Sequence, residues 1–137
     1  MARGTRVIGV DTNVLVRFLT ADDPRQHRTA LAFFSARTPA DPAYVSAVTL
    51  AETVWLLRRR YGLTPEEILE SLTMIIDSDD FVVEGREAIE SVRSGTGKPA
   101  QLTDFVIARI GQKAGCTRTV TFDRLAAKAV PDMELLT

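Results

Sequence analysis

The chain has little of several features that would decide its class at once. It contains one cysteine, Cys116, and one histidine, His27, among 137 residues. A single cysteine excludes an internal disulfide and a cysteine-rich metal site, and we expect Cys116 to be a small buried hydrophobic side chain. No apolar run approaches the roughly 18 residues of a membrane span, and the N-terminus lacks the apolar region of a signal peptide. We therefore expect a cytoplasmic protein without a membrane partner.

An excess of either charge is also missing. The chain has 17 basic and 18 acidic residues, 45% hydrophobic residues and a mean hydropathy of +0.02, as expected of one soluble globular domain over residues 1–137. Domains that bind nucleic acids usually carry a basic excess. If four acids hold metal, however, 14 acids remain beside the 17 basic residues, and 14 of those are arginines, which suit bidentate phosphate contacts.

Strand and helix patterns alternate along the chain. Short β-branched or apolar runs predict strands at 6–10, 44–46, 81–83, 117–122 and 133–136. Apolar spacing and capping residues predict helices at 13–19, 24–37, 48–61, 64–76, 86–93, 102–114 and 125–129. Such alternation requires crossover connections, so we expect an α/β fold whose five-stranded, mostly parallel sheet carries helices on both faces.

Two acids follow strands directly. Asp11 ends the run "RVIGV" and Asp123 ends "TRTVTF". An ionised carboxylate within a buried apolar run costs several kcal/mol unless a partner, hydrogen bonds or a metal compensates it. Functional sites of parallel sheets lie outside the C-terminal ends of the strands, so we expect Asp11 and Asp123 at one edge.

Two further acids lie on predicted helices and lack a local basic partner. Glu52 is surrounded on its helix by Val48, Trp55 and Leu56, and Asp104 has Ala108 one turn later. Neither acid has a basic residue four positions on that could form an ion pair with it. We expect the parallel topology to bring Asp11, Glu52, Asp104 and Asp123 together.

A cluster of four carboxylates needs protons or cations. Two carboxylates about 4 Å apart repel by roughly 4 kcal/mol at an effective dielectric constant near 20. Mg²⁺ and Mn²⁺ prefer oxygen ligands, and such ions activate water and stabilise displacement at phosphorus.

Four motifs in this order resemble those of PIN-domain ribonucleases, most closely the VapC-type toxins of bacterial toxin–antitoxin pairs. They are "VDTNVLVRFL", "VSAVTLAETVWLL", "LTDFVIARIGQKAGC" and "TVTFDRLA", and together they cover nearly the whole chain. The resemblance implies a PIN-like fold and a Mg²⁺- or Mn²⁺-dependent endoribonuclease of a type II toxin–antitoxin system. It also implies single-stranded RNA as substrate, a homodimer, and a cognate antitoxin that blocks the site.

By the same resemblance, Asp11, Glu52, Asp104 and Asp123 are the catalytic, metal-binding acids. Asn13 matches a polar residue that braces the first acid, and Thr121 matches a hydroxyl near the metal or its water. Many relatives carry a fifth acid one helical turn before the third, where this chain has Gln101.

Each acid also has a purely structural interpretation. Asp11 and Asp123 are favoured N-cap residues for the helices that follow them. Glu52 is expected in a first helical turn, where a carboxylate benefits from the helix dipole, and Asp104 has the same first-turn interpretation. One shared cause explains all four better than four separate ones.

Other residues have competing interpretations. The run Arg58, Arg59, Arg60 either contacts RNA phosphates or is a solvated helix end, and His27 is expected to face solvent rather than to be catalytic. Trp55 and Phe33 are expected in the core or at a dimer contact. A catalytically silent binding module is the alternative function. A metal-dependent phosphatase fits less well, because an aspartyl nucleophile typically needs a second aspartate where this chain has Asn13.

Overall fold

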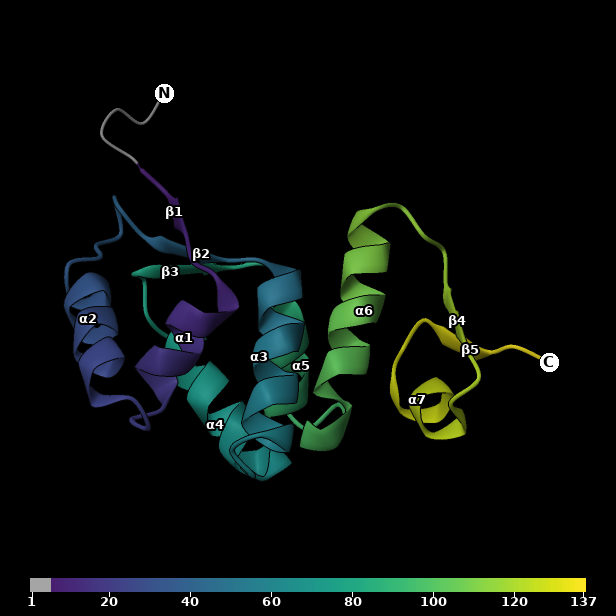
Figure 1. The fold of residues 1–137 in the computed structure, drawn as a ribbon. Helices are drawn as coiled ribbons and strands as arrows, with labels where there is room; N and C mark the ends of the chain where they lie inside the picture. The colour runs from purple at the N-terminus through teal and green to yellow at the C-terminus, as the bar shows by residue number, and fades with distance from the viewer. Residues whose placement is uncertain (1–5) are drawn as a thin grey trace.

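The computed structural model describes residues 6–137, in which strands and helices alternate (Figure 1). The elements are β1 (Ile8–Gly9), α1 (Thr12–Leu19), α2 (Pro24–Ser35), β2 (Ala43–Val45), α3 (Ala47–Arg59), α4 (Pro65–Ile76), β3 (Phe81–Val83), α5 (Arg86–Arg93), the 3-10 helix η1 (Pro99–Gln101), α6 (Leu102–Lys113), β4 (Thr119–Thr121), α7 (Arg124–Ala129) and β5 (Met133–Leu135). Each predicted strand and helix is present, β3 and α5 with the predicted bounds and the others with shifted ends, and η1 occupies part of a predicted loop. The α/β class is therefore confirmed.

Local signals set the starts of the helices. Asp23 accepts a hydrogen bond from the Gln26 backbone N–H at 3.0 Å, directly before a proline at the first helical position of α2. Thr64 and Glu67 form a reciprocal capping box at the start of α4, with distances of 3.1 and 2.8 Å. These side chains satisfy backbone donors that a helix leaves free at its first turn. The starts are therefore predictable from a few neighbouring residues.

The five strands form two parallel sheets rather than the single predicted sheet. Strands β1, β2 and β3 pair in that order, and β4 pairs with β5. In Figure 1 the β4–β5 pair lies beyond α6, away from the three-stranded sheet. Because β4 has β5 as its neighbour and does not reach β1, β1 remains an edge strand.

The core lies between one face of the three-stranded sheet and the helices beside it. Ala43 and Val45 of β2 are buried there with Leu50 and Ile89. The other face is open, since Val82 of β3 is 45% exposed. The prediction of helices on both faces therefore differs from the structure, because α6 and the C-terminal elements continue sideways instead of crossing this face.

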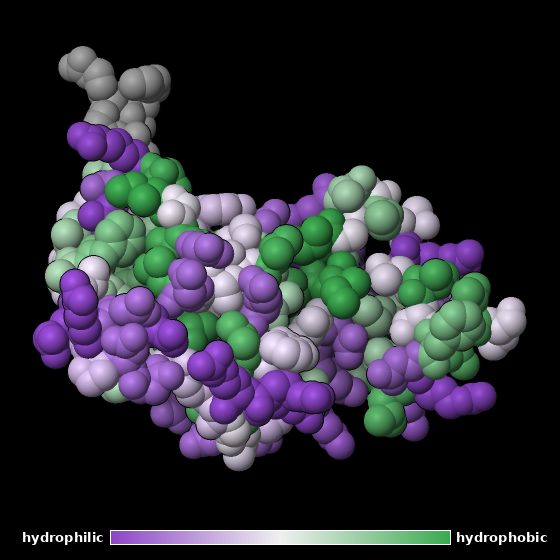
Figure 2. Space-filling view, viewed as in Figure 1, coloured by the Kyte–Doolittle hydropathy of each residue, from purple (hydrophilic) through white to green (hydrophobic). Residues whose placement is uncertain are grey.

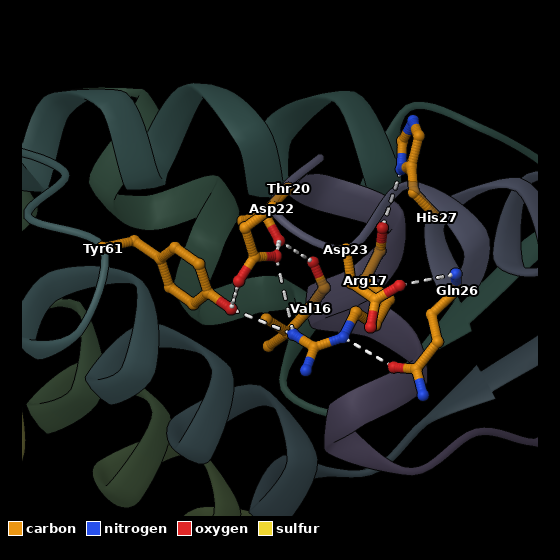
Figure 3. A network of polar contacts seen from close by, with 8 residues as sticks. All are labelled: Val16, Arg17, Thr20, Asp22, Asp23, Gln26, His27 and Tyr61. Carbon is orange, nitrogen blue, oxygen red and sulfur yellow. Dashed lines mark hydrogen bonds and ion pairs between the residues drawn. The ribbon is translucent and has the colours of Figure 1, made fainter.

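A polar network joins the first two helices to the end of the third (Figure 3). Arg17 donates to Gln26 Oε1 at 2.7 Å and to the Tyr61 hydroxyl at 3.0 Å, and that hydroxyl donates to Asp22 at 2.9 Å. The Tyr61 hydrogen bond lowers the pKa of the Asp22 carboxyl below its usual range. His27 Nδ1 donates to the Arg17 carbonyl oxygen at 2.8 Å. His27 is therefore a partly buried brace, which corrects the expectation that it faces solvent.

Three other side-chain expectations can be compared with the structure. Cys116 is exposed, because it follows the end of α6 outside the core, so its predicted burial is wrong. Phe33 packs partly buried against the core, whereas Trp55 on α3 is exposed. No helix within residues 6–137 is long and apolar enough to cross a bilayer.

Candidate functional site

The first two predicted acids meet through one threonine. Asp11 follows β1 and caps α1, because its Oδ1 accepts a hydrogen bond from the Thr12 backbone N–H at 2.8 Å. The buried Thr12 hydroxyl donates to Oε1 of Glu52 on α3 at 2.5 Å. Since α3 follows β2, the neighbour of β1, the parallel pairing places both acids at the C-terminal edge of these strands.

The surroundings of these two acids differ in part from the sequence expectations. Asp11 is exposed at the end of β1, which is an edge strand among the described residues, so the anticipated cost of burying this carboxylate does not arise here. Helix α3 begins at Ala47 after the cap residue Ser46, which places Glu52 in the second turn. The first-turn interpretation of Glu52 is therefore wrong, and the helix dipole does not account for its position.

The third and fourth acids form a second pair. Asp104 lies in the first turn of α6. Asp123 follows β4 and caps α7, with its Oδ1 accepting from the Ala126 backbone N–H at 3.0 Å. Burial, and then the negative charge of Asp123, raise the pKa of the Asp104 carboxyl above its usual value. The Thr121 hydroxyl accepts from the Asp123 backbone N–H at 3.0 Å and so braces the turn.

Three of the four carboxylates are held through one oxygen. Asp11 and Asp123 use Oδ1 for their caps, and Glu52 uses Oε1 for Thr12. Within residues 6–137, no protein donor forms a hydrogen bond with the second oxygen of any of these three groups. The hydrogen bonds therefore fix the position of each carboxylate and leave one oxygen able to bind a ligand.

The structure arranges the acids as two pairs and not as one cluster. Among the described residues, no three acidic, histidine or cysteine side chains are close enough to hold a metal ion. Of the four acids, Glu52 alone lines a cavity of about 560 Å³ that lies between α3 and the η1–α6 segment of the described chain. We call this space the α3 cavity.

The donor chemistry of the pairs fits a hard divalent cation. Carboxylate oxygens are the ligands that Mg²⁺ and Mn²⁺ prefer, and one or two carboxylates usually suffice when water and phosphate supply the rest. Burial is the larger cause of the raised pKa of Asp104, and repulsion by the negative charge of Asp123 is the smaller one. A cation beside Asp104 and Asp123 would remove that repulsion.

The remaining predicted site residues lie near these pairs. Asn13 lines a groove of about 910 Å³ with Asp11 and Arg25, and within residues 6–137 its side chain forms no hydrogen bond with Asp11. The Arg58–Arg60 run lies exposed at the end of α3, and Arg58 lines the α3 cavity. The amide of Gln101 bonds to Lys98 and to the Leu125 carbonyl, so it connects η1 with α7.

Thr12 is a candidate functional residue that the sequence analysis did not identify. Its backbone and side chain contact two of the four predicted acids. The available signal was a hydroxyl side chain directly after the acid that ends a strand. A residue at the first position of a helix is normally attributed to helix formation alone, which is why this signal is weak.

Comparison with known proteins gives a family match. The model of the PIN domain family matches residues 8–130. A search of curated proteins found no match. A similar solved structure is the crystal structure of VapC20 from Mycobacterium tuberculosis, described as a Sarcin-Ricin loop cleaving toxin, with 23% identity, 89% of this chain and 94% of that chain covered, and a TM-score of 0.44.

Proposed function

The chain belongs to the PIN domain family, and from this premise we propose that it is a Mg²⁺- or Mn²⁺-dependent endoribonuclease. The observation that carries the proposal is the arrangement of the four predicted acids. Asp11 and Glu52 are joined by Thr12, and Asp104 lies within reach of the negative charge of Asp123, which raises its pKa. In Asp11, Glu52 and Asp123, one carboxylate oxygen accepts a hydrogen bond, and the other has no protein donor among the residues that the structure describes.

The chain's own residues have definable roles in this proposal. Asp11, Glu52, Asp104 and Asp123 would hold the ion directly or through water, and Thr12 would keep the first two at fixed positions. When bound, the ion supplies a water with a lowered pKa and stabilises charge at the scissile phosphate. The products expected from such hydrolysis carry 5′-phosphate and 3′-hydroxyl ends.

The substitution Asp11→Asn tests this function without removing the helix cap. Asparagine is as good an N-cap as aspartate, so we expect nearly unchanged thermal stability together with loss of RNA cleavage. The assay follows cleavage of RNA by purified protein with Mg²⁺ or Mn²⁺ and again with EDTA. Cleavage that persists in Asp11→Asn or in EDTA would refute the assignment.

A catalytically silent binding module is the second candidate, and one observation favours it. The acids form two pairs and not one cluster within the described residues. Calorimetry with Mn²⁺ separates the two candidates, since a pure binding module has no reason to bind Mn²⁺ through these carboxylates. Saturable Mn²⁺ binding that Asp104→Asn weakens would support the nuclease.

We also propose a cognate antitoxin and a homodimer as partners. The support is exposed apolar surface on the C-terminal elements, where Phe122 is 80% and Leu125 is 71% exposed. Side chains of this kind are buried when a partner chain binds. Coexpression with the neighbouring gene, followed by light scattering of the purified protein, measures both assemblies. A protein that remains monomeric at high concentration would contradict the dimer.

A further inference from the structure

Helix α3 presents exposed apolar side chains on the same face as Glu52. Trp55 is 59% exposed and Val48 is 75% exposed, and their spacing of three and four residues from Glu52 places all three side by side on the helix. All three line the α3 cavity, whose opposite wall includes Pro99, Ala100 and Thr103. Figure 2 shows hydrophobic side chains gathered in the middle of this face, over α3 and α6.

Two arginine side chains lie near Trp55. The Arg59 guanidinium lies 5.9 Å from the centre of the Trp55 ring, and Arg58 lines the cavity itself. In the part of the chain that the structure describes, no acidic side chain forms a salt bridge with Arg58, Arg59 or Arg60. Proteins that bind single-stranded nucleic acids stack the bases on aromatic side chains and contact the phosphates with positively charged side chains. Trp55 and the neighbouring arginines provide this combination.

We propose that the α3 cavity holds an unpaired RNA base stacked on Trp55, with Arg58 and Arg59 on the adjoining phosphates. The inference builds on the proposed ribonuclease function and adds a substrate-positioning site to it. The cavity volume of about 560 Å³ lies within the usual range for small-ligand pockets, about 300–1,000 Å³. Because Glu52 lines the same cavity, the stacked base belongs to a nucleotide close to the phosphate that is cut.

This site would select structure more than sequence. Every base has an aromatic face, so stacking tolerates different bases. A base paired within a duplex cannot expose both faces, and it must leave the helix before it reaches Trp55. We therefore expect loops and unpaired stretches to be preferred over duplex RNA.

The charges favour RNA over a second copy of the chain on this face. A twofold dimer centred on Trp55 would bring the arginine runs at 58–60 of both copies to the same interface. Glu52 is the one acid among the residues that line the cavity, so each copy would bring three guanidinium groups against a single carboxylate and the interface would keep an excess of positive charge, whereas phosphates attract the same groups.

Intrinsic fluorescence can report on this site directly, because Trp55 is the only tryptophan in the chain. We would titrate wild-type protein in EDTA with an unpaired oligoribonucleotide and follow tryptophan emission. Fluorescence anisotropy of the same RNA carrying a fluorescein label gives the Kd independently. We expect quenching that saturates together with the anisotropy change, and we expect duplex RNA to quench less.

Variants measure how much the stacked base contributes. Trp55→Leu keeps an apolar side chain but removes stacking, so we expect its Kd to rise about fivefold to a hundredfold. Trp55→Phe retains an aromatic ring and should keep most of the affinity. Met74→Ala is the matched control, since Met74 is also 59% exposed but lies outside the cavity.

Each outcome decides the inference separately from the proposed function. RNA binding without quenching, an unchanged Kd in Trp55→Leu, or no RNA binding at all would overturn the base site. Dimerisation that Trp55→Leu abolishes in the absence of RNA would assign the face to a second copy and overturn it too. Quenching by RNA in a protein that cuts no RNA with Mg²⁺ or Mn²⁺ would support the base site while refuting the nuclease.

Discussion

Replacing Thr12 by valine should separate the positioning of Glu52 from the stability of the fold. Valine has nearly the same shape as threonine, so packing around this 6% exposed residue is retained. The substitution removes one donor, the hydroxyl that bonds to Glu52 Oε1 at 2.5 Å. The Asp11 cap remains, because its donor is the backbone N–H of residue 12.

The expected loss of stability is small. A hydrogen bond to a charged group contributes about 1.5–3 kcal/mol when the partner is left buried without it. Glu52 is exposed, so its oxygen can bond to water instead. We therefore expect a loss of about 1 kcal/mol, which corresponds to a fall in Tm of about 4 °C for a chain of this length.

The expected loss of metal affinity is larger. Removing a hydrogen bond that orients a metal-binding carboxylate typically lowers affinity by about 10- to 100-fold. At a Mn²⁺ concentration 100 times the wild-type Kd, bound metal stabilises the protein by about 2.7 kcal/mol. A tenfold weaker Kd reduces this figure to about 1.4 kcal/mol, so the Tm increase caused by Mn²⁺ should fall by about half.

The assay measures Tm with EDTA and with Mn²⁺ for wild type, Thr12→Val and Thr12→Ser. Serine restores the hydroxyl and should restore the response to Mn²⁺. Thr53→Val is the matched control, because Thr53 is fully buried and its hydroxyl donates to the Thr49 carbonyl oxygen at 2.7 Å, away from the acids. A Thr12→Val protein that responds to Mn²⁺ like wild type would refute the positioning role.

Two further predictions concern charge. Because the pKa of Asp104 is raised in the folded protein by burial and then by Asp123, the contribution of Asp104 to stability in EDTA should be fully present below the ordinary aspartate pKa and should be lost as pH rises through the raised value. Asp104→Asn should remove that decline in urea unfolding across pH, and an identical pH profile would contradict the assignment. Changing Arg58 and Arg59 to glutamine should reduce the salt slope of single-stranded RNA binding by about 1.4. Arg118→Gln, which breaks a surface pair with Glu134, should leave that slope unchanged, and equal effects would refute a specific phosphate contact.

The elements of the fold were predictable because their signals are local. The capping box of Thr64 and Glu67 and the Asp23–Pro24 start each involve residues at most three positions apart. The caps formed by Asp11 and Asp123 were predicted for the same reason and are confirmed.

The assembly of the sheet was not predictable in the same way. Whether β4 pairs with β1 depends on where α6 places the chain after about a hundred intervening residues, and no local pattern records that choice. The structure pairs β4 with β5 instead. The separation of the acids into two pairs follows from this pairing, since Asp11 ends β1 and Asp123 ends β4.

Trp55 shows a related limit of sequence patterns. A large aromatic residue among apolar neighbours on a helix favours a core position, yet Trp55 is 59% exposed. Trp55 lines the α3 cavity, whose opposite side is formed by residues of η1 and α6. The position of η1 and α6 relative to α3 is a tertiary feature that the local sequence does not encode. The arginines that follow it in the sequence were the available sign of a different role.

Helix capping and metal binding are compatible roles for the same carboxylate. A cap needs one acceptor oxygen, and in both Asp11 and Asp123 that oxygen is Oδ1. A cation needs a second oxygen and the negative charge, neither of which the cap consumes. Asparagine keeps the acceptor oxygen that the cap needs but lacks the negative charge that the cation needs, whereas alanine lacks both. If Asp123→Asn preserves the Tm in EDTA but loses the increase with Mn²⁺, while Asp123→Ala loses both, the two roles are separate properties of one side chain. An equal Mn²⁺ response in Asp123→Asn and wild type would leave the cap as the whole explanation for this acid.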